Sequence, residues 1–287
     1  MSRASQITLF SHARPAETDD ALRHLIARAQ HHGATVRLDP DETRKHPSIA
    51  SGPGVIADAE VSDDVSLAIA LGGDGTILRA LRRYAGTSVP VFGVNFGEIG
   101  FLSTIERDEA HDGFERALTG DFDTLTLPAI AVAHPGGPHL AINDVAITRR
   151  PGERVAELAY AIGGEEVGRV RCDGLVVATP AGSTGYNLAN GGPVLAWGVE
   201  GYVVSFIAPH SLTARALVVA PEDVLAVHNR SHGAVDVSID GRPAGGVGPG
   251  EAISVGFVRE ATDLALLPGS SFYRRLREKF GKLASSY

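Results

Sequence analysis

The spacing of apolar residues predicts alternating strands and helices in the first third of the chain. Mainly apolar segments favour short buried strands at residues 7–10, 35–38, 65–71 and 89–94. After the first run, the helical spacing of one apolar face appears at Leu22, Leu25, Ile26 and Ala29. We expect helices over residues 16–32 and 76–84, and a loop rich in proline and glycine over residues 39–58. This alternation is typical of a parallel sheet covered by helices.

Beyond about residue 120 the pattern changes to short apolar segments separated by turn residues. These segments predict strands at residues 129–134, 141–149, 158–162, 175–178, 203–207, 216–219, 224–228, 235–239, 252–257 and 264–267. Turns spaced by about 8–12 residues are typical of an antiparallel sandwich or barrel. Asp240-Gly241, directly after an alternating segment, predicts a hairpin.

A final helix is expected over residues 272–280, and its basic side chains predict a solvated face. We therefore expect three parts: an α/β domain with a parallel, Rossmann-like sheet over residues 1–122, a β-rich, sandwich-like domain over residues 123–267, and a C-terminal helix over residues 268–287 that returns to the first domain.

Composition excludes several classes of protein. The chain has 26 lysines and arginines and 34 aspartates and glutamates, so its formal net charge is −8. This negative charge disfavours a nucleic-acid partner. One cysteine excludes an intrachain disulfide scaffold. No apolar stretch is long enough for a membrane span, and the first residues do not match a signal peptide. We expect a cytoplasmic protein without a membrane partner.

Glycine is the unusual component, and its placement is informative. The chain has 34 glycines in 287 residues, about 12%, where about 7% is typical. Seven of them lie in residues 72–100 and four in residues 182–192. Glycine permits close approach of the backbone to a bulky group. The two segments are therefore the first candidates for a binding site.

The first glycine-rich segment, Gly72-Gly73-Asp74-Gly75-Thr76, follows a predicted strand and precedes a predicted helix. Backbone N–H groups of such a turn suit phosphate oxygens. The carboxylate of Asp74 could act as a general base toward a hydroxyl or help to organise Mg²⁺. A simple Asp-Gly turn between strand and helix is the alternative. Residues 93–102 repeat the arrangement after the next strand, where Asn95 could bind a ligand or cap a turn.

The second segment runs from Asp173 through an apolar strand into a Gly/Ser/Thr loop that ends near Tyr186. Hydroxyls and backbone donors at a helix start suit ribose, base or phosphate groups. Asn143-Asp144 is a polar pair inside a predicted strand, which indicates either a bulge or ligand recognition. The P-loop, G-x-G-x-x-G, nucleophile-elbow and H-E-x-x-H spacings are absent from the sequence. We expect Cys172 to be a packed residue rather than a reactive thiol.

Taken together, these segments resemble the NAD kinase family. Residues 72–76 match its GGDGT motif, and residues 93–102 are similar to its glycine-rich stretch that ends in Gly-Phe-Leu. Asn143-Asp144 resembles its Asn-Glu/Asp pair, and residues 173–193 resemble its block that begins with Asp-Gly and ends with Gly-Gly-Pro. The resemblance follows the whole chain in order, with departures at Ala181, Gly185, Arg242 and residues 187–190.

The resemblance implies transfer of a terminal phosphoryl group to the 2′-hydroxyl of the adenosine ribose of NAD, which gives NADP. It implies that Asp74 is the catalytic base, and that the donor phosphates are bound by Gly72, Gly73, Gly75 and Thr76. The implied contacts to NAD are Asp74, Gly75, Asn143, Asp144, Arg154, Arg171, Asp173, Thr184, Gly185, Tyr186, Asn187, Leu188 and Ala189. Arg171, two residues before Asp173, resembles the arginine of family members that prefer oxidised NAD over NADH.

The same resemblance implies Mg²⁺ or another divalent cation, ATP or polyphosphate as the donor, and a homodimer or homotetramer. No residue is assigned to a metal. Two alternatives remain at this stage: a lipid or sugar kinase that shares the GGDGT turn, and an NAD(P)-sensing module without turnover. A lipid or sugar kinase would be distinguished from an NAD kinase by the acceptor that it phosphorylates. A sensing module would be distinguished by NAD binding without formation of a product.

Overall fold

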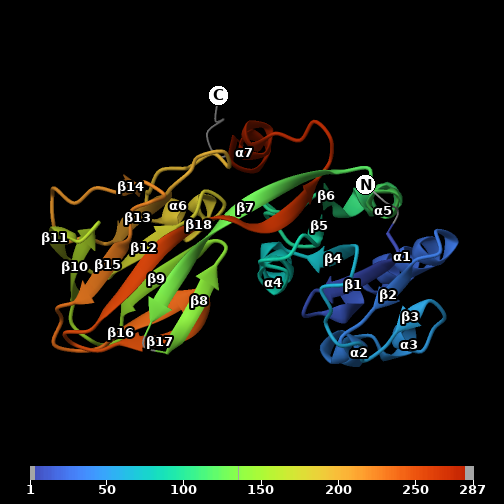
Figure 1. The fold of residues 1–287 in the computed structure, drawn as a ribbon, viewed down its shortest axis with the longest axis horizontal. Helices are drawn as coiled ribbons and strands as arrows, with labels where there is room; N and C mark the ends of the chain where they lie inside the picture. Colours follow the sequence, from blue (N-terminus) through green and yellow to red (C-terminus); the bar gives the residue numbers. More distant parts are fainter. Residues whose placement is uncertain (1–3, 135, 282–287) are drawn as a thin grey trace. The chain divides into compact units, whose positions relative to one another are not determined.

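The computed structural model describes residues 4–134 and 136–281, so the outermost residues of the expected N-terminal domain and C-terminal segment lie outside it. Two compact units are present (Figure 1). The first contains the described residues up to Thr126 and those from Thr262 onward, and the second spans Leu127–Ala261. No helix among the described residues is long and apolar enough to cross a membrane.

The first unit is built on a parallel sheet. Its strands lie in the order β5-β4-β1-β2-β3, with β6 beside the end of β5. Their bounds are β1 Gln6–Ser11, β2 Thr35–Arg37, β3 Val55–Ile56, β4 Leu67–Gly72, β5 Pro90–Asn95 and β6 Ile105–Glu106. The helices are η1 Pro15–Glu17, α1 Asp19–His31, α2 Pro40–Lys45, α3 Pro47–Ala50, α4 Asp74–Arg83, η2 Arg107–Glu109, α5 Ala110–Thr119 and α7 Phe272–Phe280. The α/β fold class predicted for this part is confirmed.

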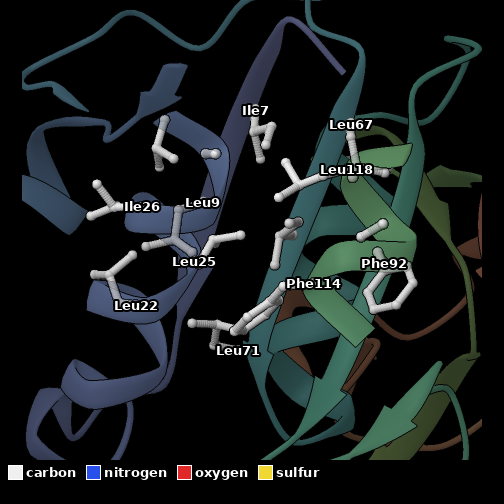
Figure 2. Close-up of a cluster of buried hydrophobic side chains, with 14 of the residues drawn as sticks. Ile7, Leu9, Leu22, Leu25, Ile26, Leu67, Leu71, Phe92, Phe114 and Leu118 are labelled. Atoms are coloured by element: carbon white, nitrogen blue, oxygen red, sulfur yellow. The ribbon is translucent and has the colours of Figure 1, made fainter. Parts of the chain in front are cut away.

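The core of the first unit lies between the sheet and helices α1 and α5 (Figure 2). Leu22, Leu25 and Ile26 of α1 and Phe114 and Leu118 of α5 pack against the sheet. The four α1 residues that fit helical spacing are all buried. Burial of a Leu, Ile or Phe side chain contributes roughly 1.5–3 kcal/mol, so this contact fixes the sheet whose strand ends carry the glycine-rich turns.

The second unit is β-rich, as the sequence predicts. One antiparallel sheet has the order β14-β13-β12-β9-β16-β17, and another antiparallel set has the order β11-β10-β15-β18. Bounds are β7 Asp123–His134, β8 Gly137–Ala141, β9 Asp144–Arg149, β10 Ala156–Ile162, β11 Glu165–Cys172, β12 Gly174–Ala178, β13 Tyr202–Ile207, β14 Leu217–Val219, β15 Leu225–Asn229, β16 Val235–Ile239, β17 Arg242–Val247 and β18 Ala252–Leu266. Val177 and Val237 share one core with Val227 and Val255, so the sheets form a sandwich.

Three local expectations were wrong. Residues 39–58 contain α2, α3 and β3, because Asp39 caps α2 by accepting the Glu42 N–H at 2.8 Å and Pro40 occupies its first turn. The two last predicted strands are one strand, β18. The predicted strand 141–149 is interrupted between Ala141 and Asp144, where β8 ends and β9 begins.

Candidate functional site

Asp74 is the first residue of α4, two residues after the end of β4. The predicted helix began at residue 76, so the structure moves Asp74 from the preceding turn into the helix. Its carboxylate is half-buried and held by the backbone: Oδ2 accepts the Phe101 N–H at 3.0 Å and Oδ1 accepts the Leu102 N–H at 2.9 Å. Each oxygen retains a further lone pair. The side chain is therefore oriented and still able to accept a proton.

The Gly72–Thr76 turn lies against the loop that follows β5. A Cβ on Gly97 would lie 3.0 Å from the Gly73 Cα, so the two backbones touch and a side chain there would displace one of them. A Cβ on Gly75 would meet nothing within 4 Å, and Gly75 is exposed. The first N–H groups of an α-helix lack partners within the helix. Space and donors therefore coincide at the start of α4.

Asn95 supports the loop after β5. Its side chain is buried, Oδ1 accepts the Gly97 N–H at 2.9 Å, and Nδ2 donates to Glu106 Oε2 at 2.8 Å. Both ends of the amide are occupied by the protein. The sequence left open whether Asn95 binds a ligand or caps a turn, and this geometry fits the capping of a turn.

In the second unit, Asn143 and Asp144 stand at the break between β8 and β9. The carboxylate of Asp240 accepts the N–H groups of Ile142 at 3.1 Å, Asn143 at 2.7 Å and Asp144 at 3.2 Å. Asp240 has a φ of 46°, in the left-handed region, at the β16–β17 hairpin. The hairpin aspartate predicted only as a turn residue thus holds the polar pair in place.

The loop 179–185 packs on the same pair. Thr179 donates its N–H to Asn143 O at 2.9 Å and its hydroxyl to Ile142 O at 2.7 Å. A Cβ on Gly182 would lie 1.9 Å from Asn143 O, so only glycine fits that contact. The pair and the glycine-rich loop, 35 or more residues apart in sequence, form one local site, because Gly182 and Thr179 both touch Asn143.

Two polar atoms of this site have unusual environments. Asn143 Oδ1 is buried and has no hydrogen-bond partner among the described residues. Burial, with the nearby charge of Asp240, raises the pKa of Asp144 to about 7. A buried acceptor without a partner costs free energy unless a ligand donor satisfies it. Both features make the pair a candidate for contact with a polar ligand group.

The remaining candidates of the second unit divide into two groups. Gly185, Tyr186 and Ala189 are exposed, and Thr184 and Leu188 are half-buried. Asn187 is fully buried, and its Nδ2 donates to Ser183 O and Pro193 O, both at 2.9 Å. Nδ2 of Asn187 thus holds the shape of the loop, while its Oδ1 is buried and has no hydrogen-bond partner among the described residues. Thr184 of η3 (Gly182–Thr184) and the other residues of α6 (Tyr186–Ala189) are the more exposed part of the loop.

Arg154 and Arg171 line a pocket of about 670 Å³ together with Arg149. The Asp173 carboxylate accepts from Arg149 Nε at 2.6 Å at the edge of β9. Glu153 and Glu157 line the same pocket. Since Arg149 is paired with Asp173, Arg154 and Arg171 are the lining arginines left to meet an anionic ligand. Cys172 next to them is buried, as predicted for a packed residue, and burial raises the pKa of its thiol to about 11.

Comparisons with known proteins identify the family of this chain. Residues 17–122 match the ATP-NAD kinase N-terminal domain, and residues 142–265 match the ATP-NAD kinase C-terminal domain. An NAD kinase of Symbiobacterium thermophilum is 36% identical over 265 residues, which cover 89% of this chain and 91% of that protein. The chain belongs to the NAD kinase family. The resemblance predicted from the motifs is confirmed.

Further relatives in the NAD kinase family extend the agreement. An NAD kinase of Thermomicrobium roseum is 38% identical over 221 residues, 74% of each chain. The structure of yeast NADH kinase complexed with NADH covers 100% of this chain and 90% of its own, with a TM-score of 0.87 and 22% identity. The Archaeoglobus fulgidus NAD kinase in complex with ATP covers 98% and 100%, with a TM-score of 0.71 and 24% identity. Both share the fold.

Sequence reasoning missed the groups that hold the NAD kinase motifs in place. The Phe101 and Leu102 N–H groups fix Asp74, and backbone donors carry no signal in the side-chain sequence. Asp240 fixes Asn143 and Asp144, and its only signal was the Asp-Gly pair of a hairpin. Asp144 and Asp240 are 96 positions apart, and only the strand pairing of β9 with β16 shows that they are neighbours.

Proposed function

We propose that this chain is an NAD kinase that transfers the terminal phosphoryl group of ATP to the 2′-hydroxyl of the adenosine ribose of NAD. The observation that carries the proposal is the carboxylate of Asp74, held by two backbone N–H groups at the start of α4 in a chain of this family. The α/β domain carrying Asp74 would bind the donor, and the β-rich domain would bind NAD.

Asp74 acts as the general base. A hydroxyl is a weak nucleophile while protonated, and a carboxylate within hydrogen-bond reach takes its proton as the oxygen attacks phosphorus. The new bond joins the ribose oxygen to the γ-phosphorus, the bond from that phosphorus to the bridging oxygen breaks, and ADP leaves. Asp74 then carries the proton. The two backbone hydrogen bonds keep the carboxylate in a fixed orientation throughout, which is the positioning that phosphoryl transfer needs.

The donor phosphates lie over Gly72, Gly73, Gly75 and Thr76 in this proposal. The open space at Gly75 and the N–H groups of the first turn of α4 support it. The NAD contacts are proposed for Gly75, the pair Asn143 and Asp144, the exposed face of residues 184–189, and Arg154, Arg171 and Asp173. The unpartnered Asn143 Oδ1 would accept from an amino or hydroxyl group of the nucleoside.

Magnesium would reach this site with the nucleotide. Among residues 4–134 and 136–281, no group of three or more His, Cys, Asp or Glu side chains could hold a metal. Mg²⁺ is bound in many kinases through substrate phosphates, waters and one or two carboxylates. The lone pairs of Asp74 left free by its two backbone donors fit such a shared site. When bound, Mg²⁺ would neutralise charge on the phosphates.

Removal of divalent cations is expected to stop the reaction without unfolding the protein. Excess EDTA should lower NADP formation from ATP by more than about 100-fold, and added MgCl₂ should restore it. The thermal unfolding midpoint should not move in EDTA, because the described residues form no metal cluster that stabilises the fold. Full activity in EDTA after dialysis against a chelating resin would contradict this part of the proposal.

The buried carboxyl of Asp144 predicts a pH dependence of stability. Its pKa is raised to about 7 in the folded protein, whereas an unfolded aspartate ionises near 3.8. The folded state therefore binds this proton more tightly, and stability decreases as pH rises from about 4 to about 7. The contribution is on the order of 4 kcal/mol.

Asp144→Asn should remove that slope. Urea unfolding at pH 5, 6, 7 and 8 is expected to show the free energy of unfolding of the wild type falling with pH relative to the Asn variant. Parallel curves for the two proteins would show that Asp144 does not carry the buried proton.

A homodimeric or homotetrameric state, implied by the family resemblance, and a cytoplasmic location, expected from the composition, stay proposals. Light scattering on the purified protein tests the first. Polyphosphate as an alternative donor is tested in the same assay as ATP.

A further inference from the structure

Helix α7 turns two of its basic residues, Arg275 and Lys279, inward. The charge run of this helix was expected to form a solvated face, which is wrong for Arg275 and Lys279. Arg275 Nη1 donates to Phe101 O at 3.1 Å and to Ser103 O, and Lys279 Nζ donates to Glu106 Oε1 at 2.6 Å. Burial lowers the pKa of the Arg275 guanidinium, and the charges of Asp74, Glu106 and Glu278 oppose that shift.

A single peptide group lies between Arg275 and Asp74. The carbonyl of Phe101 accepts from Arg275, and the N–H of Leu102, which belongs to the same peptide group, donates to Asp74 Oδ1 at 2.9 Å. A cation on the carbonyl polarises the peptide and strengthens its N–H as a donor. The guanidinium and the carboxylate therefore act on opposite ends of one dipole.

Aromatic contacts from α7 hold the same segment. The Phe101 ring lies 5.9 Å from that of Phe272 in an edge-on arrangement and 5.8 Å from that of Phe280. The two aromatic residues lie on either side of Arg275 in α7, since Phe272 is three residues before it and Phe280 is five residues after it. The position of the Phe101–Ser103 segment is thus set by the helix on both its apolar and its polar side.

We propose that Arg275 is a positioning residue for the carboxylate of Asp74 and acts through the Phe101–Leu102 peptide. The inference rests on the proposed role of Asp74 as general base. Without the guanidinium, the carbonyls of Phe101 and Ser103 lose their shared donor, and the segment whose N–H groups aim the carboxylate becomes less fixed. Orientation of the base affects the chemical step more than the binding of NAD.

The first test compares three variants of the full chain in a steady-state assay with NAD, ATP and Mg²⁺. Arg275→Gln is expected to lower kcat by about tenfold with KM for NAD changed by less than about twofold. Arg275→Lys should recover kcat to within about threefold of wild type, because one ammonium can donate to both carbonyls. Arg277→Gln removes the same charge from an exposed position of the same helix and should leave kcat within about twofold.

The second test is a double-mutant cycle with Asp74→Ala. If Arg275 acts through Asp74, Arg275→Gln lowers the residual activity of Asp74→Ala by less than about twofold, so the two losses are not multiplicative. Equal fold losses in both backgrounds, or a kcat of Arg275→Gln equal to wild type, would overturn the inference. Absence of NADP formation by the wild type would instead refute the proposed function, and an active Asp74→Ala would refute the base.

Discussion

Replacing Asp74 with alanine is expected to lower kcat for NADP formation by about 1,000-fold, within the range that a positioned general base contributes. The fold should persist, because the change removes one half-buried side chain at the start of α4. The backbone N–H groups of Phe101 and Leu102 lose their acceptor, which costs about 1–3 kcal/mol of stability unless water replaces it. Steady-state kinetics with a thermal unfolding curve separates the two effects.

Asp74→Asn is expected to disturb the structure around residue 74, although asparagine has nearly the same size as aspartate. Both oxygens of the carboxylate accept a backbone N–H, so the NH₂ group of asparagine would face a donor. We expect an equally large loss of kcat and a larger loss of stability than in Asp74→Ala. Asp112→Asn, an exposed charge change on α5, is the matched control and should stay within about twofold of wild type. Turnover near wild type in Asp74→Ala would remove the base assignment.

Gly182→Ala is expected to damage the second unit at the pair Asn143 and Asp144. The new Cβ would lie 1.9 Å from Asn143 O, a backbone atom, so the loop 179–185 or the β8–β9 break must shift. We expect a loss of stability of about 2–3 kcal/mol, as for overpacking of a tight contact. Affinity for NAD should fall at least about tenfold, because Asn143 and the loop would no longer keep their geometry.

Gly256→Ala provides the comparison within the same unit. Its Cβ would meet nothing within 4 Å, so its stability should stay within about 0.5 kcal/mol of wild type. Urea unfolding and calorimetric titration with NAD measure both quantities for both variants. If Gly182→Ala were as stable as Gly256→Ala and bound NAD equally well, the packing of the loop on Asn143 would not be part of the binding site.

The sequence predicted most of the fold where one signal dominated. Strands β4 and β5 are buried along their whole length and appear in the sequence as apolar runs. Helix α1 repeats its apolar face at Leu22, Leu25, Ile26 and Ala29, which is a clear helical period. Residues 39–58 were missed as helices because proline and glycine were read as loop signals. Pro40 in fact starts α2 after the cap Asp39. The edge strand β11 was missed because its residues are mostly polar and exposed.

The candidate site was predicted only at the level of motifs. Asp74 was found because it lies in a glycine cluster between a strand and a helix, and the polar pair was found because it interrupts an apolar strand pattern. The supports were not predictable, since they depend on tertiary contacts: Asp240 reaches Asn143 through strand pairing, and Arg275 reaches the Phe101 carbonyl from a helix more than 170 residues away. A run of charges on a short helix gave no sign that Arg275 and Lys279 face inward while Arg277 faces solvent.

The most direct test of the account is the product of one reaction. Purified protein is incubated with NAD, Mg²⁺ and ATP, with parallel arms that contain polyphosphate as donor and diacylglycerol or fructose 6-phosphate as acceptor. The account predicts NADP carrying a phosphate monoester on the adenosine 2′-oxygen, seen by phosphorus NMR, with one ADP formed for each NADP in the ATP arm. Binding of NAD by calorimetry without NADP in either donor arm, or phosphorylation of another acceptor alone, would contradict it.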